Sequence, residues 1–397
     1  MTLRHRSFVA AMLAIAIFAA LPAAAQTVKV GVVLSLSGAD SLPGQQIQRG
    51  MQLYLKENAK TLPAGAQVEL LVRDDTGPNP DVAKRLTQEL IAREHVNLVV
   101  GALYTPNAMA MAPLVTEAKI PFIVVNAATA AVTRQSPYIV RVSFTLWETA
   151  YPLGKWVAQQ GGKKGYTAVS DYAPGYDAEA AFAKGFVEGG GTMIGSVRLP
   201  LGNSNYVPYL QRIQDARPDS LYVFVPVSEA PAMMRAVGGL NLSAAGIKLV
   251  STMDLVPDQQ LLTMGDIVKG LVTSGSYSAA GDRPQNKAFV AAWKRDYGPD
   301  AVPDFTGVQG WDAMAAVFAV IKKTGGQFDG DQALAILKEW KNPDSPRGPI
   351  EIDPATRDIV QNIYIRRVEE IGGRLANTEF ATIPRVKDPW KEFNPPK

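Results

Sequence analysis

Short, almost continuously apolar segments alternate with amphipathic helical patterns along most of this chain. The first apolar segment covers residues 28–34, and a helical pattern over 45–58 follows it. In that pattern Ile47, Met51 and Tyr54 fall on one face of a helix. Strands that lack polar alternation are typical of parallel sheets, whose two faces are covered by helices. The alternation therefore predicts an α/β fold built on parallel sheets.

The alternation occurs twice, which predicts two similar Rossmann-like lobes in series. The first run has expected strands at 28–34, 68–72, 98–100 and 121–125 and expected helices at 45–58, 81–93 and 105–118. The second run has expected strands at 166–170, 194–199, 221–225 and 248–251 and expected helices at 147–160, 178–188, 206–216 and 229–238. A further strand is expected at 271–277. The helices expected at 284–297 and 306–323 cannot form a domain alone, so we expect these two helices to complete the first lobe.

The junctions between the two runs are short and are not the Gly/Ser-rich sequences of a flexible linker. We expect residues 26–145 and 277–357 to form the first lobe, and residues 146–276 and 358–397 to form the second. The C-terminal stretch from Asn377 is rich in proline and charge, so we expect it on the surface. Several short crossings between two lobes suit a hinge.

Residues 1–25 have the pattern of a secretory signal peptide. Arg4 and Arg6 form a basic start, residues 8–21 are apolar, and small residues precede the expected cleavage site. The apolar stretch is shorter than the roughly 20 residues that a spanning helix needs, which argues against a membrane anchor. No cysteine follows the cleavage site, so a lipid anchor is not expected. The leader therefore predicts export to the periplasm.

Composition argues against nucleic-acid binding and against the common catalytic sites. The net charge of +3 falls to +1 once Arg4 and Arg6 leave with the leader, so no broad basic surface is expected. The chain has no cysteine, and His95 is the one histidine left after the leader, so the usual zinc sites cannot be built. We expect His95 in a surface turn. A Ser-His-Asp triad built on it is the enzymatic alternative.

The glycine-rich segments do not match the known phosphate-binding signatures. Residues 161–165 have the wrong spacing for a phosphate loop, and residues 189–195 precede a strand instead of following one. Asp74 and Asp75 follow the second strand and suit either a metal or acid/base pair or, as we favour, a turn in which they cap N–H groups. We expect no enzymatic activity, no metal and no cofactor.

The pattern instead favours recognition of a small ligand. In parallel α/β sheets, ligands bind beyond the carboxyl ends of the strands. In the first lobe these positions, 35–41, 102–106 and 126–129, are rich in hydroxyl and small residues. Free N–H groups at the helix starts beside them can hold a carboxylate. In the second lobe, the corresponding positions include Tyr172 and Phe224, which offer aromatic faces.

The order and spacing of several segments carry a family resemblance. They are residues 29–38, 73–75, 97–101, 121–129, 171–177 and 206–213. Through them nearly the whole mature chain resembles the type I periplasmic solute-binding proteins of ABC transporters, the leucine/isoleucine/valine-binding group. The resemblance implies a Venus flytrap architecture, in which two lobes joined by a three-segment hinge close on a ligand. It also implies delivery of that ligand to an ABC permease in the inner membrane, and we expect a monomer.

The resemblance also implies which positions touch the ligand. Those of the first lobe are Ser41, Leu42, Pro43, Tyr104, Thr105, Ala128 and Thr129. Of these, Thr105, Ala128 and Thr129 would hold a ligand carboxylate through hydroxyl and backbone groups. In members that bind α-amino acids, an acid of the second lobe holds the ammonium, and this position falls on Met253 or Asp254.

The second lobe favours an aromatic or apolar carboxylate over a free amino acid. Tyr172 and Phe224 are expected at strand ends, with Trp147 near a crossing and Phe305 on the returning segment. Such faces suit a ring or a branched chain. The alternative is that Phe224 belongs to the core and Trp147 covers the hinge helix. A desolvated ammonium needs a carboxylate partner, so Asp254 in the cleft would favour an amino acid.

The expected function is therefore that of a periplasmic substrate-binding component of an ABC importer. Its ligand would be a small carboxylate, either an aromatic or apolar acid or a branched-chain or other amino acid. Two alternatives stay open: the same fold as a ligand-sensing module of a membrane receptor, and a periplasmic hydrolase.

Overall fold

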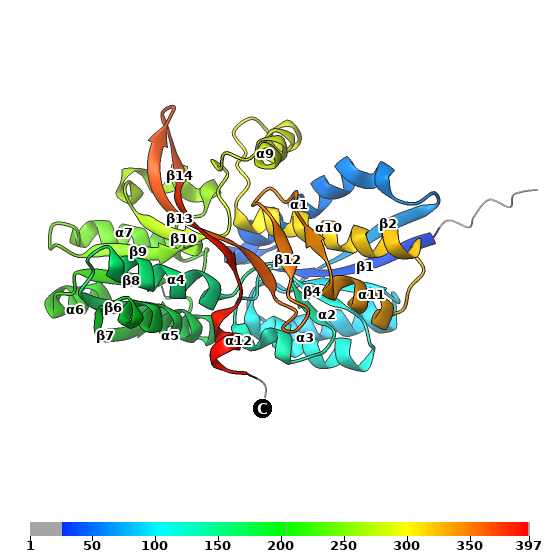
Figure 1. Ribbon diagram of the computed structural model, residues 1–397, viewed down its shortest axis with the longest axis horizontal. Helices are drawn as coiled ribbons and strands as arrows, with labels where there is room; N and C mark the ends of the chain where they lie inside the picture. The colour runs from blue at the N-terminus through cyan, green and yellow to red at the C-terminus, as the bar shows by residue number, and fades with distance from the viewer. Residues whose placement is uncertain (1–25, 204, 396–397) are drawn as a thin grey trace, which may run out of the picture.

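The computed structural model describes residues 26–203 and 205–395, so the predicted leader, residues 1–25, lies outside the described residues. Two α/β lobes lie side by side in Figure 1. No helix in the described ranges is both long enough and apolar enough to span a membrane.

The first lobe is built on a parallel sheet with the strand order β2-β1-β3-β4-β5. Its strands are β1 (Gln26–Leu34), β2 (Ala66–Asp74), β3 (Leu98–Gly101), β4 (Phe122–Val124) and β5 (Ile139–Arg141). Its helices are α1 (Ser41–Asn58), α2 (Pro80–Ala92), α3 (Thr105–Glu117), α9 (Pro284–Tyr297), α10 (Phe305–Thr324) and α11 (Gly330–Lys338). Helices α10 and α11, from beyond residue 277, contribute side chains to the core beside the first sheet.

The second lobe is built on a larger sheet with the strand order β11-β12-β13-β10-β9-β8-β6-β7, whose end at β11 and β12 extends beyond this lobe, with β12 packed in the core of the first. Its strands are β6 (Lys164–Ser170), β7 (Thr192–Leu199), β8 (Ser220–Phe224), β9 (Lys248–Thr252), β10 (Val272–Gly275), β11 (Lys341–Asn342), β12 (Ile350–Ile352), β13 (Ile359–Ile371) and β14 (Arg374–Val386). Its helices are α4 (Leu146–Gln159), α5 (Ala173–Glu188), α6 (Val207–Ala216), α7 (Ala230–Leu240), α8 (Leu261–Met264) and α12 (Pro389–Phe393). Strands β6 to β10 are parallel, whereas β13 and β14 add an antiparallel ribbon.

Strand β13 passes from one lobe to the other. Its first residues, Ile359 and Val360, pair with β12, and Tyr364 to Arg367 pair with β10. Residues 142–145 and 276–283 make the other two passages between the lobes. The two-lobed α/β architecture predicted from the sequence is therefore confirmed, while the exact lobe limits remain a prediction.

The expectation that the C-terminal stretch from Asn377 lies on the surface is confirmed only in part, because most of its described residues are exposed or half-buried but a few are buried. Residues 374–386 form β14, paired with β13 along most of its length, and α12 then packs against α4. Asp388 and Lys391 are buried there. The stretch is ordered because its strand completes the sheet and its charges have partners inside the protein.

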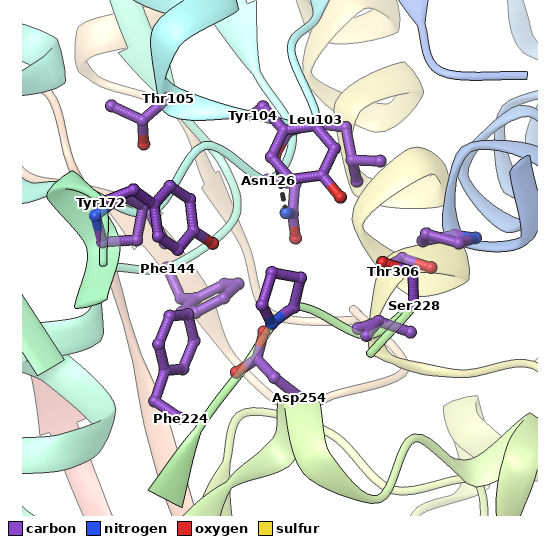
Figure 2. A pocket seen from close by; sticks show the side chains of 15 residues that line it. Leu103, Tyr104, Thr105, Asn126, Phe144, Tyr172, Phe224, Ser228, Asp254 and Thr306 are labelled. Atoms are coloured by element: carbon purple, nitrogen blue, oxygen red, sulfur yellow. Dashed lines mark hydrogen bonds between the residues drawn. The ribbon is translucent and has the colours of Figure 1, made fainter. Parts of the chain in front are cut away.

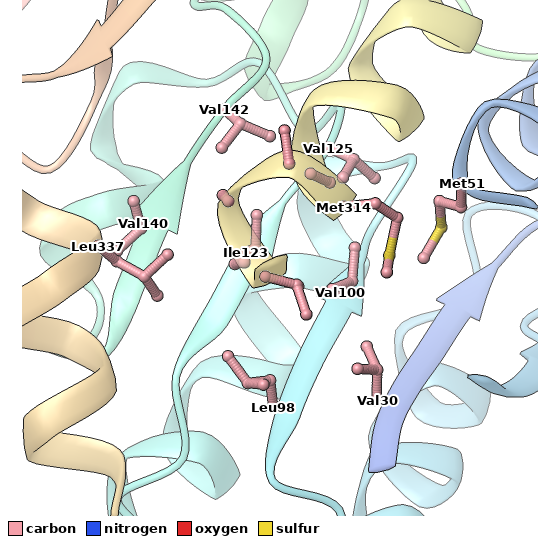
Figure 3. Close-up of a cluster of buried hydrophobic side chains, with 14 of the residues drawn as sticks. Val30, Met51, Leu98, Val100, Ile123, Val125, Val140, Val142, Met314 and Leu337 are labelled. Atoms are coloured by element: carbon pink, nitrogen blue, oxygen red, sulfur yellow. The ribbon is translucent and has the colours of Figure 1, made fainter. Parts of the chain in front are cut away.

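The core of the first lobe lies between the sheet and the pair α1 and α10. Figure 3 shows Val30, Val100 and Ile123 from neighbouring strands facing Met51 of α1 and Met314 of α10. The two helices approach closely because small residues stand where they cross. A Cβ added to Gly50 would lie 1.9 Å from the carbonyl oxygen of Gly307, and one added to Gly310 would lie 2.1 Å from that of Ile47.

A buried ionic cluster joins the C-terminal helix to the first lobe. Asp358 accepts from Arg141 Nε and from Lys391 Nζ, both at 2.8 Å. Arg141 Nη1 also donates to the carbonyl oxygens of Ala127 at 2.8 Å and Thr129 at 2.9 Å. Burial opposes ionisation of Asp358, but the two cations hold its pKa below the usual value. This cluster fixes the backbone of the loop after β4.

Candidate functional site

A cavity lies between the lobes, beyond the carboxyl ends of β3, β4, β8 and β9 (Figure 2). It contains about 480 Å³ of space free of atoms, part of it open to solvent. Its walls are formed by Pro43, Leu103, Tyr104, Thr105, Asn126, Ala128, Phe144, Tyr172, Pro174, Phe224, Pro226, Val227, Ser228, Asp254 and Thr306.

The first-lobe wall carries hydroxyl groups and a helix start. Thr105 is the first residue of α3 and is 2% exposed, and its Oγ1 donates to Thr129 Oγ1 at 3.1 Å. No side chain caps the first turn of α3. Its N–H groups carry the positive end of the helix dipole, which favours an anion at this end of the cavity.

Tyr104 completes the first-lobe wall, and a hydrogen bond fixes its side chain. Its hydroxyl donates a hydrogen bond to Asp40, which precedes α1. Burial and the neighbouring carboxylate of Asp40 raise the pKa of the Tyr104 phenol, so the hydroxyl keeps its proton. The ring is therefore a fixed part of the wall.

The second-lobe wall is mainly aromatic and apolar. Tyr172 precedes α5, and Phe224 ends β8. Their rings are nearly parallel, with centroids 6.3 Å apart and an interplanar angle of 15°. Phe144, on a passage between the lobes, adds a third ring, as Figure 2 shows. A flat apolar ligand fits against these faces.

Asp254 is the acidic residue of the cavity wall. It follows β9 and is 6% exposed, and its Oδ2 accepts a hydrogen bond from Thr252 Oγ1 at 2.8 Å. Burial raises the pKa of the carboxyl to about 6. The neighbouring Met253 is fully buried within the second-lobe core and does not line the cavity.

The cavity brings together seven of the residues expected from the sequence and leaves five outside its wall. The seven are Pro43, Tyr104, Thr105, Ala128, Tyr172, Phe224 and Asp254. The five are Ser41, Leu42, Thr129, Trp147 and Phe305.

The five residues outside the wall lie in the first turn of α1, behind the wall, or in contact with other aromatic side chains. Ser41 and Leu42 form the first turn of α1, where Leu42 is 37% exposed. Thr129 lies behind Thr105. Trp147 packs edge-on against Phe393 of α12, and Phe305 packs behind Phe144 in the core.

Eight residues of the wall were not among the individual ligand contacts expected from the sequence. They are Leu103, Asn126, Phe144, Pro174, Pro226, Val227, Ser228 and Thr306. Leu103 and Asn126 lie in the loops 102–106 and 126–129 that the sequence placed at the site, and the four residues of the second lobe lie in the segments that follow β6 and β8. Phe144 and Thr306 had no such signal, because they enter the cavity from a passage and from α10.

The two lobes touch across the cleft. The carboxylate of Asp177 in α5 accepts a hydrogen bond from the backbone N–H of Ala130, at 2.7 Å. Gln46 in α1 donates to Gln259, at 2.5 Å. Burial raises the pKa of Asp177, and the N–H of Ala130 partly offsets this. These contacts join the lobes in a closed arrangement.

Within the described ranges, no group of three or more His, Cys, Asp or Glu side chains is placed to hold a metal ion.

Comparison with known proteins gives matches along nearly the entire chain. A family model described as a periplasmic binding protein matches residues 27–374. The Leu/Ile/Val-binding protein homolog 6 of Brucella abortus (strain 2308) is 36% identical over 385 residues, which cover 96% of this chain and 98% of that protein.

Two solved structures are similar in both sequence and fold. A solute-binding protein of an ABC transporter from Rhodopseudomonas palustris BisB5, in complex with 3,4-dihydroxybenzoic acid, is 46% identical with a TM-score of 0.88, covering 92% of this chain and 99% of that chain. Another from R. palustris, in complex with 4-hydroxybenzoate, is 41% identical with a TM-score of 0.87, covering 91% of this chain and 98% of that chain.

Proposed function

Because the chain belongs to the periplasmic binding protein family, we propose that it serves an ABC importer and captures a small aromatic carboxylate between its lobes. The observation that carries this proposal is the cavity, in which a hydroxyl-bearing helix start faces an aromatic wall. The similar R. palustris proteins were solved with hydroxylated benzoates, which have this combination of a carboxylate and a ring.

Each end of the cavity has a separate role in this proposal. On binding, the Thr105 hydroxyl turns its one proton from Thr129 Oγ1 to the ligand carboxylate, which also accepts from free N–H groups of the first-lobe loops, with Ala128 beside it. The ring lies against Tyr172, Phe224 and Phe144, which replace water on its faces. Thr129 contributes indirectly, because its backbone N–H donates to Thr105 Oγ1 and so positions that hydroxyl.

The cellular setting follows from the family and the leader. Residues 1–25 direct export, and the mature chain acts in the periplasm as a monomer that presents its ligand to an inner-membrane permease. Its role is binding and delivery, with no chemical conversion of the ligand.

Titration calorimetry on residues 26–397 tests this function. We expect benzoate and 4-hydroxybenzoate to bind, and benzyl alcohol, which lacks the carboxylate, to bind far more weakly. At 100 times its Kd, either acid should raise the free energy of unfolding by about 2.7 kcal/mol. Tight binding of leucine with no response to any aromatic acid would refute the aromatic assignment.

We also expect 4-hydroxybenzoate to close the lobes. A ligand that touches both lobes stabilises the closed form and shifts the population toward it. Small-angle X-ray scattering should therefore show a smaller radius of gyration with the ligand than without it. An unchanged radius at saturation would contradict closure.

The contact between Asp177 and Ala130 provides a variant for this closure experiment. Asp177→Ala removes an acceptor that meets the first lobe only when the lobes touch, so we expect weaker binding and a smaller change in radius. Asp171→Ala is the matched control, because Asp171 is exposed and its carboxylate pairs with Tyr176 in the same lobe.

A further inference from the structure

Two side chains of the cavity wall, far from Thr105 in the sequence, can accept a hydrogen bond from a ligand, and one of them has no donor among the described residues. Asn126 and Asp254 both line the cavity, one from each lobe (Figure 2). A ligand that fills this space with hydrogen or carbon alone leaves those oxygens without partners. A buried acceptor without a donor costs free energy, so this end of the cavity favours a ligand that carries a hydrogen-bond donor there.

The orientation of the Asn126 amide is set by the protein. Its Nδ2 donates to the carbonyl oxygen of Leu103 at 2.9 Å, which leaves Oδ1 as the free atom. That oxygen is buried and has no hydrogen-bond partner among the described residues. It is an acceptor, and another acceptor cannot satisfy it.

Asp254 is the stronger of the two acceptors because its carboxylate carries charge. Among the described residues, Thr252 is the one whose side chain donates to it, and that bond occupies Oδ2. The positive charge of Arg366 lies near enough to favour ionisation of Asp254, but two guanidinium nitrogens of Arg366 donate elsewhere, to Tyr277 O and Thr273 Oγ1. Burial raises the pKa of Asp254 to about 6, and the hydrogen bond from Thr252 and the charge of Arg366 limit that rise. Because the residue lines the cavity, its carboxyl group can accept a further hydrogen bond from a ligand.

We infer that Asp254 accepts a hydrogen bond from a hydroxyl on the ligand ring, opposite the ligand carboxylate, which makes hydroxylated aromatic carboxylates the ligand class of this site. The inference rests on the proposed function and goes one step further, from aromatic acids in general to those with a donor at the far end. The apolar side chains of Phe224, Pro226 and Val227 line the same wall, so a neutral hydroxyl is desolvated there at less cost than an ammonium.

The test compares three ligands that differ at ring position 4, opposite the carboxylate. Benzoate has no substituent at that position, 4-methoxybenzoate has an oxygen that cannot donate, and 4-hydroxybenzoate has a donor. A hydrogen bond to a charged acceptor corresponds to roughly 10- to 150-fold in affinity. By calorimetry we expect the wild type to bind 4-hydroxybenzoate at least about tenfold more tightly than either of the other two.

Asp254→Asn removes the charge and keeps the shape of the acceptor. We expect it to reduce the preference for 4-hydroxybenzoate to within about threefold, because a neutral hydrogen bond is much weaker than a charge-assisted one. Its affinity for benzoate should stay within about threefold of wild type, which also shows that the variant is folded. Asp258→Asn is the matched control: Asp258 is also buried and lies 3.8 Å from Arg366, but it does not line the cavity.

The outcomes separate this inference from the proposed function. If the wild type binds all three benzoates equally, or if its preference survives Asp254→Asn, the role of Asp254 is wrong and the aromatic-acid function stands. If no benzoate binds and leucine does, in a manner that collapses in Asp254→Asn, both the function and the inference fail.

Discussion

Replacing Asp358 with Asn is expected to lower the free energy of unfolding by about 3–5 kcal/mol, the usual cost of removing one partner from a buried ion pair. The carboxylate of Asp358 neutralises Arg141 and Lys391, and all three side chains are buried. The amide removes the carboxylate that both buried cations contact directly. Chemical denaturation at neutral pH, followed by circular dichroism, measures the change.

The matched control for this variant is Asp388→Asn in the same cluster. Burial and the neighbouring Asp358 raise the pKa of Asp388 to about 7, so this carboxyl is only partly charged at neutral pH. It caps α12 by accepting from the N–H of Trp390, a role that asparagine fills equally well. We expect a loss below about 1 kcal/mol. Equal losses in the two variants would show that the ion pairs do not stabilise the fold.

Thr105→Val is expected to weaken binding of 4-hydroxybenzoate by roughly 10- to 150-fold, since a hydrogen bond to a charged group contributes about 1.5–3 kcal/mol. Valine keeps the shape of the side chain and removes the hydroxyl that faces the carboxylate end of the cavity. Calorimetry measures the change. Thr105→Ser, which keeps the hydroxyl, should restore most of the affinity.

Thr116→Val is the control for the threonine substitution. Thr116 lies on the same helix at its other end, where its hydroxyl donates to the carbonyl of Ala112. We expect this variant to bind as the wild type does. A change of less than twofold in Thr105→Val would show that Thr105 does not hold the carboxylate.

Strands and helices of the first lobe could be predicted because their signals are local. Strand β1 is a run of buried apolar residues, and the helical spacing of Ile47 and Met51 places both in the core beneath the sheet. The loops that follow β3 and β4 were then located by the general rule that ligands bind beyond strand ends. Thr105 and Ala128 were expected at the cavity for that reason and by family resemblance, and both line it.

The ribbon of β13 and β14 could not be predicted in the same way. Strand β13 pairs with β12 at one end and with β10 and β14 further along, so its faces are covered by different neighbours from one end to the other. Its sequence therefore shows no single period of two. The residues that bury β13 come from distant parts of the chain, so local β-strand propensity does not predict this strand.

The sequence by itself determined the two-lobed α/β architecture, the ends of the strands where a ligand binds, and the absence of cysteine and of the common zinc sites. Only the tertiary structure decided which side chains meet in the cavity. Met253 and Asp254 are adjacent in a short 3-10 turn, Met253–Leu255, where neighbouring residues point in different directions and no periodicity assigns them. Packing of Met253 into the core leaves Asp254 to face the cleft. Trp147 and Phe305 do not line the cavity for the same reason. Their rings pack against Phe393 and Phe144, which are distant from them in the chain. An aromatic ring is buried where it meets such a complementary surface.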